Sequence, residues 1–515
     1  MKILYLGIAS KYIHTMPAGW FLSEFLTKNG FKVTEIYRNV NEDYKSILND
    51  ITELDIDILL LSVYIFNVKL IKRLIKDIKK LKPGITFIIG GPEADEDLGA
   101  DFIILGEGER ALLKLLKSGG DKVTYEDIID NLDEIPSPYT RERLSDSRNK
   151  LIYYESSRGC PYRCAYCMAG LSQKVRYFSL ERVYSDLKNI VSSGAKIVKF
   201  TDRTFNANRE RTENILEFIK DNFSGSGACF HLEIGGDIIK ESTLELLKTM
   251  PPGLIQLETG VQSLNEKSLK AVDRAFSWEK FYNNISRIIS SGNIHTHIDL
   301  IIGLPYDNLD TFGRSMDKVF ALRPHMLQLN LLKMLKYTPI RKSYKAVFNN
   351  DAPYEIIKTP DMSEEDIMKL IRIQSVFNRV YNSGRFYHTL EFMLKKSAYE
   401  FFVKLSDYLY NNGIDIIKPE SLSKGILEYS GNDERVRELM RFDYLLVNNS
   451  RIKPALLRKE YTEEFKKFIS GKNDCSVLYE EFSCLYGISE KRVIIKFDYK
   501  RKNPVSGRYG YEIVN

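Results

Sequence analysis

Apolar positions repeat with two alternating periods over residues 1–132. Short apolar runs, typical of buried strands, alternate with segments in which apolar side chains recur every three or four residues, as on one face of a helix. The predicted strands are Lys2–Leu6, Phe31–Tyr37, Ile58–Val63, Thr86–Ile89 and Phe102–Leu105, and the clearest helices are Ala18–Asn29 and Val68–Lys80. This alternation predicts an α/β domain with a doubly wound (Rossmann-like) parallel sheet.

A second alternating region follows a polar linker at residues 133–150, which contains Ile135-Pro136-Ser137-Pro138. Six apolar strands are separated by helical patterns such as Leu180–Ser192 and Thr212–Asn222. The strands are Leu151–Glu155, Ile197–Thr201, Cys229–Ile234, Leu254–Glu258, Thr296–Ile302 and Met326–Leu332. Six strand–helix repeats predict a partial TIM-type (β/α)6 barrel over residues 151–335.

The pattern changes beyond residue 336. Long helical periods cover Ser363–Ser383, His388–Leu409 and Arg435–Asn448, and one short strand is expected at Arg492–Tyr499. Residues 336–515 are therefore predicted to form a mainly helical C-terminal domain.

Composition agrees with a chain of several domains. The 515 residues are 43% hydrophobic and 28% charged, which is ordinary for a globular protein. No apolar run is long enough to span a membrane, and the N-terminus lacks the pattern of a secretion signal. We expect a cytoplasmic protein without membrane contact.

Charge adds one further hint. The net charge is +6, and the basic excess lies in the C-terminal third. The basic, tyrosine-rich segment Phe497–Pro504 raises the alternative of nucleic-acid binding, but a solvated chain end is favoured.

Three of the six cysteines lie within eight residues, in Cys160-Pro161-Tyr162-Arg163-Cys164-Ala165-Tyr166-Cys167, directly after the first barrel strand. Three thiolates can hold three irons of a four-iron cluster and leave the fourth iron free for another ligand. A structural zinc normally needs four protein ligands, and no histidine lies nearby. Cys229, Cys475 and Cys484 are distant and are interpreted as small hydrophobic residues. The spacing therefore favours an iron–sulfur cluster.

This C-x3-C-x2-C segment, with Tyr166 before the last cysteine, resembles the signature of the radical S-adenosylmethionine (SAM) superfamily. The resemblance implies a [4Fe-4S] cluster on Cys160, Cys164 and Cys167. It further implies that the free iron binds SAM, which one-electron reduction cleaves to a 5′-deoxyadenosyl radical. An electron donor of the flavodoxin or ferredoxin type is the implied partner.

The same resemblance extends along the barrel to the coproporphyrinogen-oxidase-like and methylthiotransferase-like branches. It implies that Arg274 pairs with the SAM carboxylate, and that Glu233, Gln262 and Asp299 contact the ribose or the amino group. The implied SAM-binding residues are Tyr166, Asp202, Glu233, Gln262, Arg274 and Asp299. The Gly-Gly-Glu motif common after the second strand is replaced by Thr201-Asp202-Arg203.

A doubly wound domain ahead of such a barrel resembles the cobalamin-binding subclass of the superfamily. The Asp-x-His-x-x-Gly motif of mutase-type cobalamin domains is absent, so we expect the loop at Ser62–Asn67 rather than a histidine such as His14 to face the cobalt. A nucleotide is the alternative ligand, although no Gly-x-Gly-x-x-Gly opens a helix. The expected cobalamin contacts are Tyr12, Ser62, Val63, Tyr64, Asn67, Gly90, Gly91, Gly106, Glu107, Gly108 and Glu109.

These features predict a cobalamin-dependent radical SAM enzyme with a C-terminal domain of unknown function. The leading hypothesis is methylation of an unactivated carbon of an unidentified substrate. The alternatives are a radical rearrangement, ring contraction or redox reaction without methyl transfer, and a non-catalytic corrinoid or iron–sulfur sensor that binds nucleic acid. His231, His297, Tyr64 and Asp202 are candidate acids or bases, and none of them stands out.

Overall fold

The computed structural model describes residues 1–125, 127–171, 174–449, 452–472 and 474–514. The chain folds into two compact units. The first comprises Met1–Glu258, Lys270–Phe281 and Leu332–Ile357, and the second comprises Thr259–Leu269, Tyr282–Leu331 and Lys358–Asn515. None of the described helices has the length and apolar composition needed to cross a membrane.

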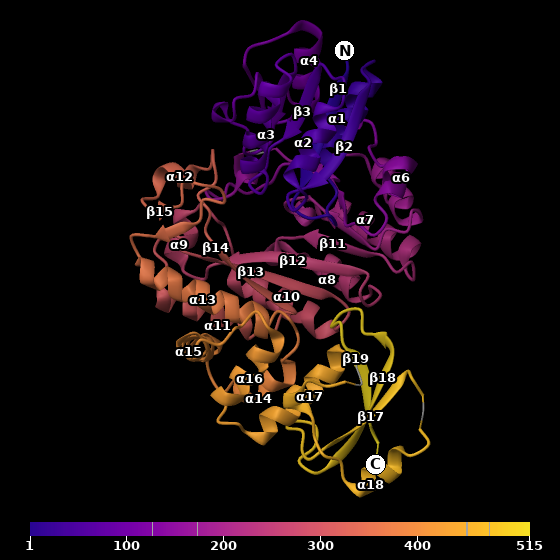
Figure 1. The fold of residues 1–515 in the computed structure, drawn as a ribbon, viewed down its shortest axis with the longest axis vertical. Helices are drawn as coiled ribbons and strands as arrows, with labels where there is room; N and C mark the ends of the chain where they lie inside the picture. Colours follow the sequence, from indigo (N-terminus) through magenta and orange to yellow (C-terminus); the bar gives the residue numbers. More distant parts are fainter. Residues whose placement is uncertain (126, 172–173, 450–451, 473, 515) are drawn as a thin grey trace. The chain divides into compact units, whose positions relative to one another are not determined.

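The N-terminal part of the first unit is a parallel six-stranded sheet (Figure 1). Its strands lie in the order β2 (Val33–Asn39), β1 (Ile3–Ala9), β3 (Ile58–Ser62), β4 (Thr86–Gly90), β5 (Phe102–Leu105) and β6 (Val123–Tyr125). Helices α1 (Pro17–Lys28), α2 (Tyr44–Thr52), α3 (Val68–Leu81) and α4 (Glu109–Ser118) alternate with the strands. The predicted doubly wound fold is confirmed, while α2, α4 and β6 were not predicted.

Two apolar layers hold this sheet. Strand residues such as Leu59 and Leu61 pack with Ile71 and Ile75 of α3 in one layer. Leu60 and Ile104 face the other layer, which includes Leu112 of α4. The side chains of both layers are nearly fully buried, as expected for parallel strands that are covered on both faces.

The barrel strands form a second six-stranded sheet, in the order β14-β13-β12-β11-β10-β7. Their bounds are β7 (Ile152–Tyr154), β10 (Ile197–Phe200), β11 (Cys229–Glu233), β12 (Ile255–Gln262), β13 (His295–Ile302) and β14 (Met326–Leu331). The barrel helices are α6 (Leu180–Ser192), α7 (Arg209–Phe223), α8 (Glu241–Lys248), α9 (Glu266–Ala271), α10 (Trp278–Ser291) and α11 (Leu309–Phe320). All six strands overlap their predicted ranges, and the predicted barrel-like α/β fold is confirmed.

Short elements complete the first unit. Helix α5 (Arg141–Asp146) lies in the predicted linker, where Thr140 caps it by accepting a hydrogen bond from the Arg143 amide. Strands β8 (Ser157–Arg158) and β9 (Arg176–Tyr177) form an antiparallel ribbon. Helix α12 (Pro339–Ser343) and strands β15 (Val347–Phe348) and β16 (Ile356–Lys358) follow the barrel.

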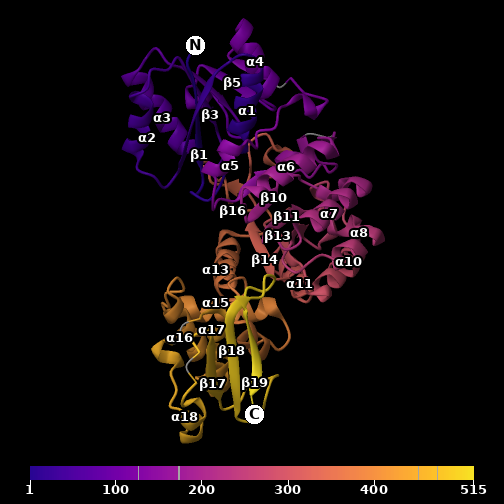
Figure 2. The same ribbon diagram turned by 90° about the vertical axis from the view of Figure 1, so that its right-hand side faces the viewer.

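The C-terminal part of the second unit combines helices with an antiparallel sheet (Figure 2). The helices are α13 (Glu364–Val380), α14 (Tyr387–Met393), α15 (Ala398–Asn411), α16 (Pro419–Tyr429), α17 (Glu434–Val447) and α18 (Glu463–Ile469). The sheet has the order β17 (Val477–Phe482), β18 (Val493–Lys502) and β19 (Tyr509–Val514).

These elements differ from the sequence prediction at several points, and α16 and α18 were not predicted. The single helix expected at His388–Leu409 is broken, because the Ser397 hydroxyl caps a new helix by accepting from the Glu400 amide. The strand expected at Arg492–Tyr499 is longer and has two partners, β17 and β19, that were not predicted. The basic segment Phe497–Lys502 is thus part of a sheet rather than a free chain end.

A buried charge network joins α17 to this sheet. Arg441 is 2% exposed and forms ion pairs with Glu438 and with Glu480, the latter at 3.1 Å. Lys453 also pairs with Glu480, at 2.8 Å. The Arg441 guanidinium also donates to the Glu481 carbonyl. We call Glu438, Arg441, Lys453 and Glu480 the C-terminal charge network.

Candidate functional site

The three clustered cysteines lie on one folded loop of the first unit. The loop starts after β8 and is closed by the β8–β9 ribbon, in which Arg158 is opposite Arg176. Its turns are held by backbone hydrogen bonds from Cys167 to Cys164 and from Gly170 to Cys167. Cys160 and Cys164 are buried, Cys167 is half-buried, and all three are free thiols. Three thiols on one loop fit an iron–sulfur cluster with one open iron.

A glycine makes the entry to this loop possible. Gly159 has a φ of +99°, and a Cβ at this position would lie 2.2 Å from the Lys174 carbonyl oxygen. Only glycine tolerates both the left-handed backbone and this close approach. The position before Cys160 is therefore restricted by the backbone of the ribbon.

One cation lies against the cysteine loop. The Arg274 Nη1 is 3.6 Å from the Cys164 sulfur and 3.5 Å from the Tyr166 hydroxyl. Although burial opposes the charged guanidinium, Tyr166 and Cys164 raise the pKa of Arg274 above its usual value. Burial raises the pKa of the Cys167 thiol. A permanent positive charge beside thiols of this kind favours an anionic ligand or thiolate at the loop.

Asp202 fastens the beginning of the same loop. Its buried carboxylate accepts hydrogen bonds from the Ser156 amide at 2.8 Å, the Ser156 hydroxyl at 2.5 Å and the Ser157 amide at 3.1 Å. Burial raises the pKa of Asp202. Its contacts in the structure connect the end of β10 to the end of β7, so they position the cysteine loop.

A cavity of about 460 Å³ opens at the carboxyl ends of the N-terminal strands. Side chains and glycines from the predicted loops line it, namely Ser62, Tyr64, Gly90, Gly91, Gly106, Glu107, Gly108 and Glu109. Residues beside the cysteine loop line it too, namely Glu155, Ser157, Arg158, Gly159, Thr201 and Arg203. We call this space the cofactor cavity. Ligands of doubly wound sheets bind at this edge.

The glycine loop after β4 shapes the cavity wall. Gly91 has a φ of +102°, and a Cβ there would lie 2.6 Å from the Val63 carbonyl oxygen. The Val63 amide in turn donates to the Gly90 carbonyl at 2.7 Å. The two loops are thus packed backbone to backbone, which leaves the space in front of them open to a ligand.

Charged side chains connect the cavity to the cysteine loop. Arg158 forms ion pairs with Glu109 at 2.6 Å, Glu155 at 3.0 Å and Glu107 at 3.2 Å. Arg176 also pairs with Glu107. Although burial opposes ionisation, Arg158 holds the pKa of Glu109 below its usual value. We call Glu107, Glu109, Glu155, Arg158 and Arg176 the arginine–glutamate cluster.

A row of polar side chains shares one face of the barrel strands. In the strand register, Tyr153 of β7 is opposite Lys199 of β10, and Lys199 is opposite His231 of β11. Successive strand residues alternate between faces. The intervening residues, Tyr154, Phe200 and Leu232 among them, are fully buried on the other face.

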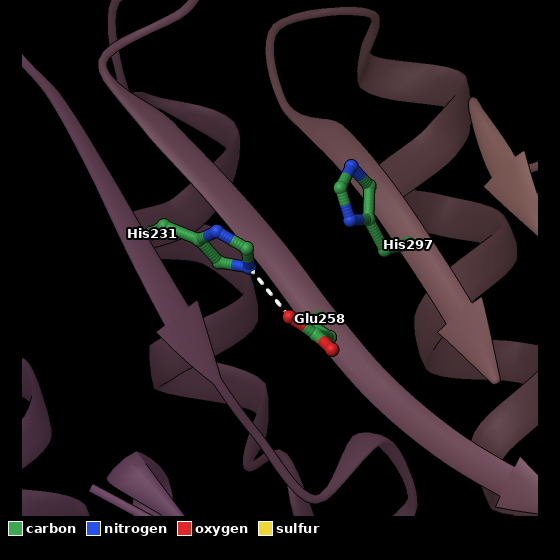
Figure 3. Close-up of side chains that lie close together, drawn as sticks. All are labelled: His231, Glu258 and His297. Atoms are coloured by element: carbon green, nitrogen blue, oxygen red, sulfur yellow. Dashed lines mark ion pairs between the residues drawn. The ribbon is translucent and has the colours of Figure 1, made fainter. Parts of the chain in front are cut away.

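Two carboxylates, Glu233 of β11 and its register partner Glu258 of β12, lie two residues further along this face. The Glu258 carboxylate lies 2.8 Å from Nε2 of His231 (Figure 3). It also accepts a hydrogen bond from Lys199 at 3.0 Å, while Glu233 lies 3.7 Å from Lys199. Burial opposes ionisation of Glu258, but His231 and Lys199 together lower its pKa to about 2. Burial raises the pKa of Glu233. We call Tyr153, Lys199, His231, Glu233 and Glu258 the polar row.

Comparison with protein families gives three matches in chain order. Residues 4–116 match the B12 binding domain, residues 154–319 match the radical SAM superfamily, and residues 342–501 match DUF4080, a protein family of unknown function. One chain thus combines a match to the B12 binding domain with a match to the radical SAM superfamily, the combination found in cobalamin-dependent radical SAM enzymes. Cobalamin, a [4Fe-4S] cluster and SAM, the cofactors predicted from the sequence, agree with these two matches.

Curated relatives are distant. The chain is 24% identical over 312 residues to 2-(S-pantetheinyl)-carbapenam-3-carboxylate methyltransferase of Streptantibioticus cattleyicolor, covering 53% of this chain and 46% of that protein. It is 23% identical over 331 residues to the cobalamin-dependent radical SAM methyltransferase TokK of Streptomyces tokunonensis, covering 56% and 48%. The chain thus spans about half the length of these relatives.

Solved structures share the fold. The cobalamin-dependent SAM radical enzyme OxsB, with aqua-cobalamin and SAM bound, aligns with a TM-score of 0.59 and 17% identity over 86% of this chain and 79% of its own. The methyltransferase TsrM from Kitasatospora setae, with cobalamin and a [4Fe-4S] cluster bound, aligns with a TM-score of 0.54 and 16% identity over 66% and 77%.

The structure gathers most of the predicted site residues within the first unit. Cys160, Cys164, Cys167, Tyr166 and Arg274 lie together at the cysteine loop. Of the remaining residues predicted to bind SAM, Asp202 positions the loop and Glu233 belongs to the polar row. Gln262, which has a φ of +70°, and Asp299 lie in the second unit. His297, also labelled in Figure 3, belongs to that unit.

Three predicted cobalamin contacts do not line the cofactor cavity. Val63 is buried behind it. The Asn67 amide is fully buried, accepting from the Tyr64 amide and donating to the Ile8 and Ser62 carbonyls. Tyr12 is 67% exposed and lines a separate cavity. That these three residues contact cobalamin stays a prediction, because none of them lines the cofactor cavity.

Sequence reasoning missed the residues that connect the two cofactor regions. Arg158 and Arg176 were not singled out, and neither was Lys199. Arg158 adjoins the cysteine motif, which is a usable signal. Arg176 and Lys199 carry no motif, because their roles depend on strand pairing that a single sequence does not reveal.

Proposed function

We propose that this protein is a methylase that uses cobalamin and radical SAM chemistry to transfer a methyl group to an unactivated carbon. The observation that carries the proposal is the cofactor cavity, whose lining combines the glycine loops of the N-terminal sheet with Ser157, Arg158 and Gly159 beside the cysteines. A corrinoid seated against the glycine loops would adjoin a cluster held by the neighbouring cysteines. Two of the relatives are methyltransferases, which supports the same activity.

When bound, the reduced cluster supplies one electron for SAM cleavage and the corrinoid supplies a methyl carrier. The chain's own contribution is placement. Arg274 provides a fixed positive charge beside Cys164, suited to the SAM carboxylate. Arg158 neutralises Glu109 at the cavity wall and adjoins the cysteine loop in sequence. Asp202 holds the loop at Ser156 and Ser157.

The polar row supports a polar substrate. Lys199, Glu233 and Glu258 bring charged groups, and His231 brings a polar ring, to one face of the barrel strands. Even when they are paired, buried charges contribute little to stability, because the cost of desolvation offsets their attraction, so their presence favours a role in binding. Lys199 lies 3.0 Å from Glu258 and 3.7 Å from Glu233, so Glu233 is the less closely paired carboxylate and would accept from a hydrogen-bond donor or cation on the substrate.

The proposal includes the domain division made from sequence. Residues 1–132 would bind cobalamin, residues 151–335 would bind the cluster and SAM, and residues 336–515 would form a third domain, with 133–150 as the linker. A flavodoxin or ferredoxin type protein would deliver the electron.

The test is a product assay with anaerobically reconstituted protein. Incubation with SAM, a reductant and metabolite extract should yield 5′-deoxyadenosine together with a product that has gained one methyl group. The Cys164→Ala variant is the matched control and should yield neither. Formation of 5′-deoxyadenosine with no methylated product would instead indicate a rearrangement or redox reaction. Absence of 5′-deoxyadenosine under all conditions would reject both.

A further inference from the structure

The C-terminal part of the second unit contains a cavity of about 680 Å³. It lies within the segment that matches a family of unknown function, and all of its lining residues belong to one compact unit. The lining comes from the end of α13, the segment that precedes α14, the first turns of α16, one face of α17 and the turn Ala455–Leu457. Its volume is that of a site for a small organic molecule. We call it the C-terminal cavity.

The inner wall of this cavity is apolar. Phe386, Leu422, Met440 and Leu457 line it and are each less than 6% exposed. At the mouth, Ile417 is 74% exposed and extends the apolar surface outward. This wall can bury the hydrocarbon part of a ligand, and each square ångström of apolar surface so buried contributes about 25 cal/mol.

The wall is also held in place. The Tyr444 hydroxyl donates to the Ile452 carbonyl at 3.2 Å, which ties the segment carrying Leu457 to α17. The Leu457 amide donates to the Pro454 carbonyl at 2.9 Å. A cavity whose walls are tied in this way loses little conformational freedom when it binds a ligand.

The polar part of the lining carries an excess of positive charge. Arg379, Arg385 and Lys424 line the cavity, against the single carboxylate of Glu420. Arg379 uses one guanidinium nitrogen for the Ser375 carbonyl and hydroxyl. Lys424 lies 3.7 Å from Glu428 at an exposed position. Arg385 is exposed, and no carboxylate among the described residues pairs with it.

The amino end of helix α16 adds to the positive charge of this cavity. Helix α16 begins with Pro419 and has no side-chain cap, because its N-cap residue is Lys418. The first turn, Pro419–Leu422, lines the cavity. The amino end of a helix carries partial positive charge from its unpaired amides, which favours an anion nearby.

We propose that the C-terminal cavity binds an amphiphilic anion, a molecule with an apolar chain or ring and one carboxylate or phosphate group. The apolar body would lie against Phe386, Leu422, Met440 and Leu457, and the anionic group would lie at Arg385 and Lys424. This site is separate from the cofactor cavity, which belongs to the other unit. It does not depend on the proposed methyl transfer.

The test is fluorescence titration of the full-length protein with 11-(dansylamino)undecanoic acid and with its methyl ester. The acid should bind saturably and at least about tenfold more tightly than the ester, which corresponds to about 1.4 kcal/mol. Displacement by laurate or by dodecyl phosphate shows which acidic group is preferred.

Variants separate this cavity from other sites. Arg385→Gln should weaken binding of the acid about fivefold to tenfold and leave the ester unchanged, while Arg314→Gln, an exposed arginine on α11 that does not line the cavity, should have no effect. Leu456→Trp and Ser421→Trp fill the cavity from two different walls, and each should abolish binding of both probes while circular dichroism remains native. Equal binding of acid and ester, equal effects of Arg385→Gln and Arg314→Gln, or unchanged binding to both folded tryptophan variants would overturn the proposal.

Discussion

Two clusters of buried charges in the described residues differ in what borders them. The arginine–glutamate cluster of the first unit lies along the cofactor cavity, where Glu107, Glu109 and Arg158 are lining residues. The C-terminal charge network is enclosed by protein, with Arg441 and Glu480 no more than 2% exposed. A cluster beside a cavity can exchange a protein partner for water or a ligand, whereas an enclosed one cannot. We therefore expect the first to control cofactor binding and the second to control stability.

The largest expected effect concerns the cysteine loop that adjoins the first cluster. Replacing Cys160, Cys164 and Cys167 together by Ala should abolish iron binding, because no thiolate ligand remains on the loop. Cobalamin binding should persist, since the glycine loops are untouched. Metal analysis after anaerobic reconstitution measures both. Cys229→Ala is the matched control and should keep its iron. Retention of iron by the triple variant would show that the cluster is held elsewhere.

Arg441→Met tests the enclosed network. Removing the cation leaves Glu438 and Glu480 buried. Among the described residues, Glu438 then keeps Lys459 as a partner, and Glu480 keeps Lys453 and Tyr461. Breaking a buried pair from one side costs about 3–5 kcal/mol. Denaturant unfolding should show that the free energy of unfolding falls by this amount. Arg435→Gln, which removes an exposed ion pair, is the control and should lower it by less than about 1 kcal/mol.

Arg158→Met likewise removes a buried cation, here from the arginine–glutamate cluster beside the cofactor cavity. Because water can enter the cofactor cavity and solvate Glu109, the loss of stability should be smaller than for Arg441→Met. Cobalamin uptake, measured by absorbance after gel filtration, should fall. If the two variants lose equal stability and Arg158→Met still binds cobalamin normally, the distinction between the clusters is wrong.

Gly91→Ala sharpens the assignment of the cavity wall. A Cβ there would collide with the Val63 carbonyl oxygen at 2.6 Å, so the loops after β3 and β4 must separate. Cobalamin affinity should drop several-fold. Gly99→Ala has a comparable positive φ of +76° but no neighbour within 4 Å, and it should bind cobalamin as the wild type does. Equal losses in both variants would mean that backbone strain, rather than the cavity wall, is responsible.

The smallest effect concerns pH and the polar row. Lys199 and His231 lower the pKa of Glu258 to about 2 in spite of burial. A carboxylate with a depressed pKa stabilises the folded state above its unfolded pKa of about 4.3, and this stability is lost as the pH falls toward the folded pKa. As the pH is lowered between these two values, the free energy of unfolding of Glu258→Gln should fall less than that of the wild type.

Denaturation midpoints measured at several acidic pH values provide the comparison. Glu181→Gln, which replaces an exposed carboxylate on α6, should follow the wild type. The assigned ion pairs would be contradicted if Glu258→Gln also followed the wild type.

The sequence predicted those features that depend on local pattern. Period and spacing located the six barrel strands, the cysteine loop and the glycine loops of the cofactor cavity. The sequence did not predict the features that depend on contacts between distant parts of the chain. Strands β17 and β19 gain stability only by pairing with β18, and Lys199 joins Glu258 only through the register of three strands. Tyr12 belongs to a loop that matched the family pattern, yet its side chain lines another cavity.

The most direct test of the central claim, that one cavity adjoins both cofactor sites, is electron paramagnetic resonance of reconstituted protein carrying cob(II)alamin and the reduced cluster. Two paramagnetic centres at adjoining sites interact magnetically. The spectrum of protein containing both should therefore be broadened relative to the sum of spectra from samples that contain each centre alone. A spectrum equal to that sum would contradict the shared cavity.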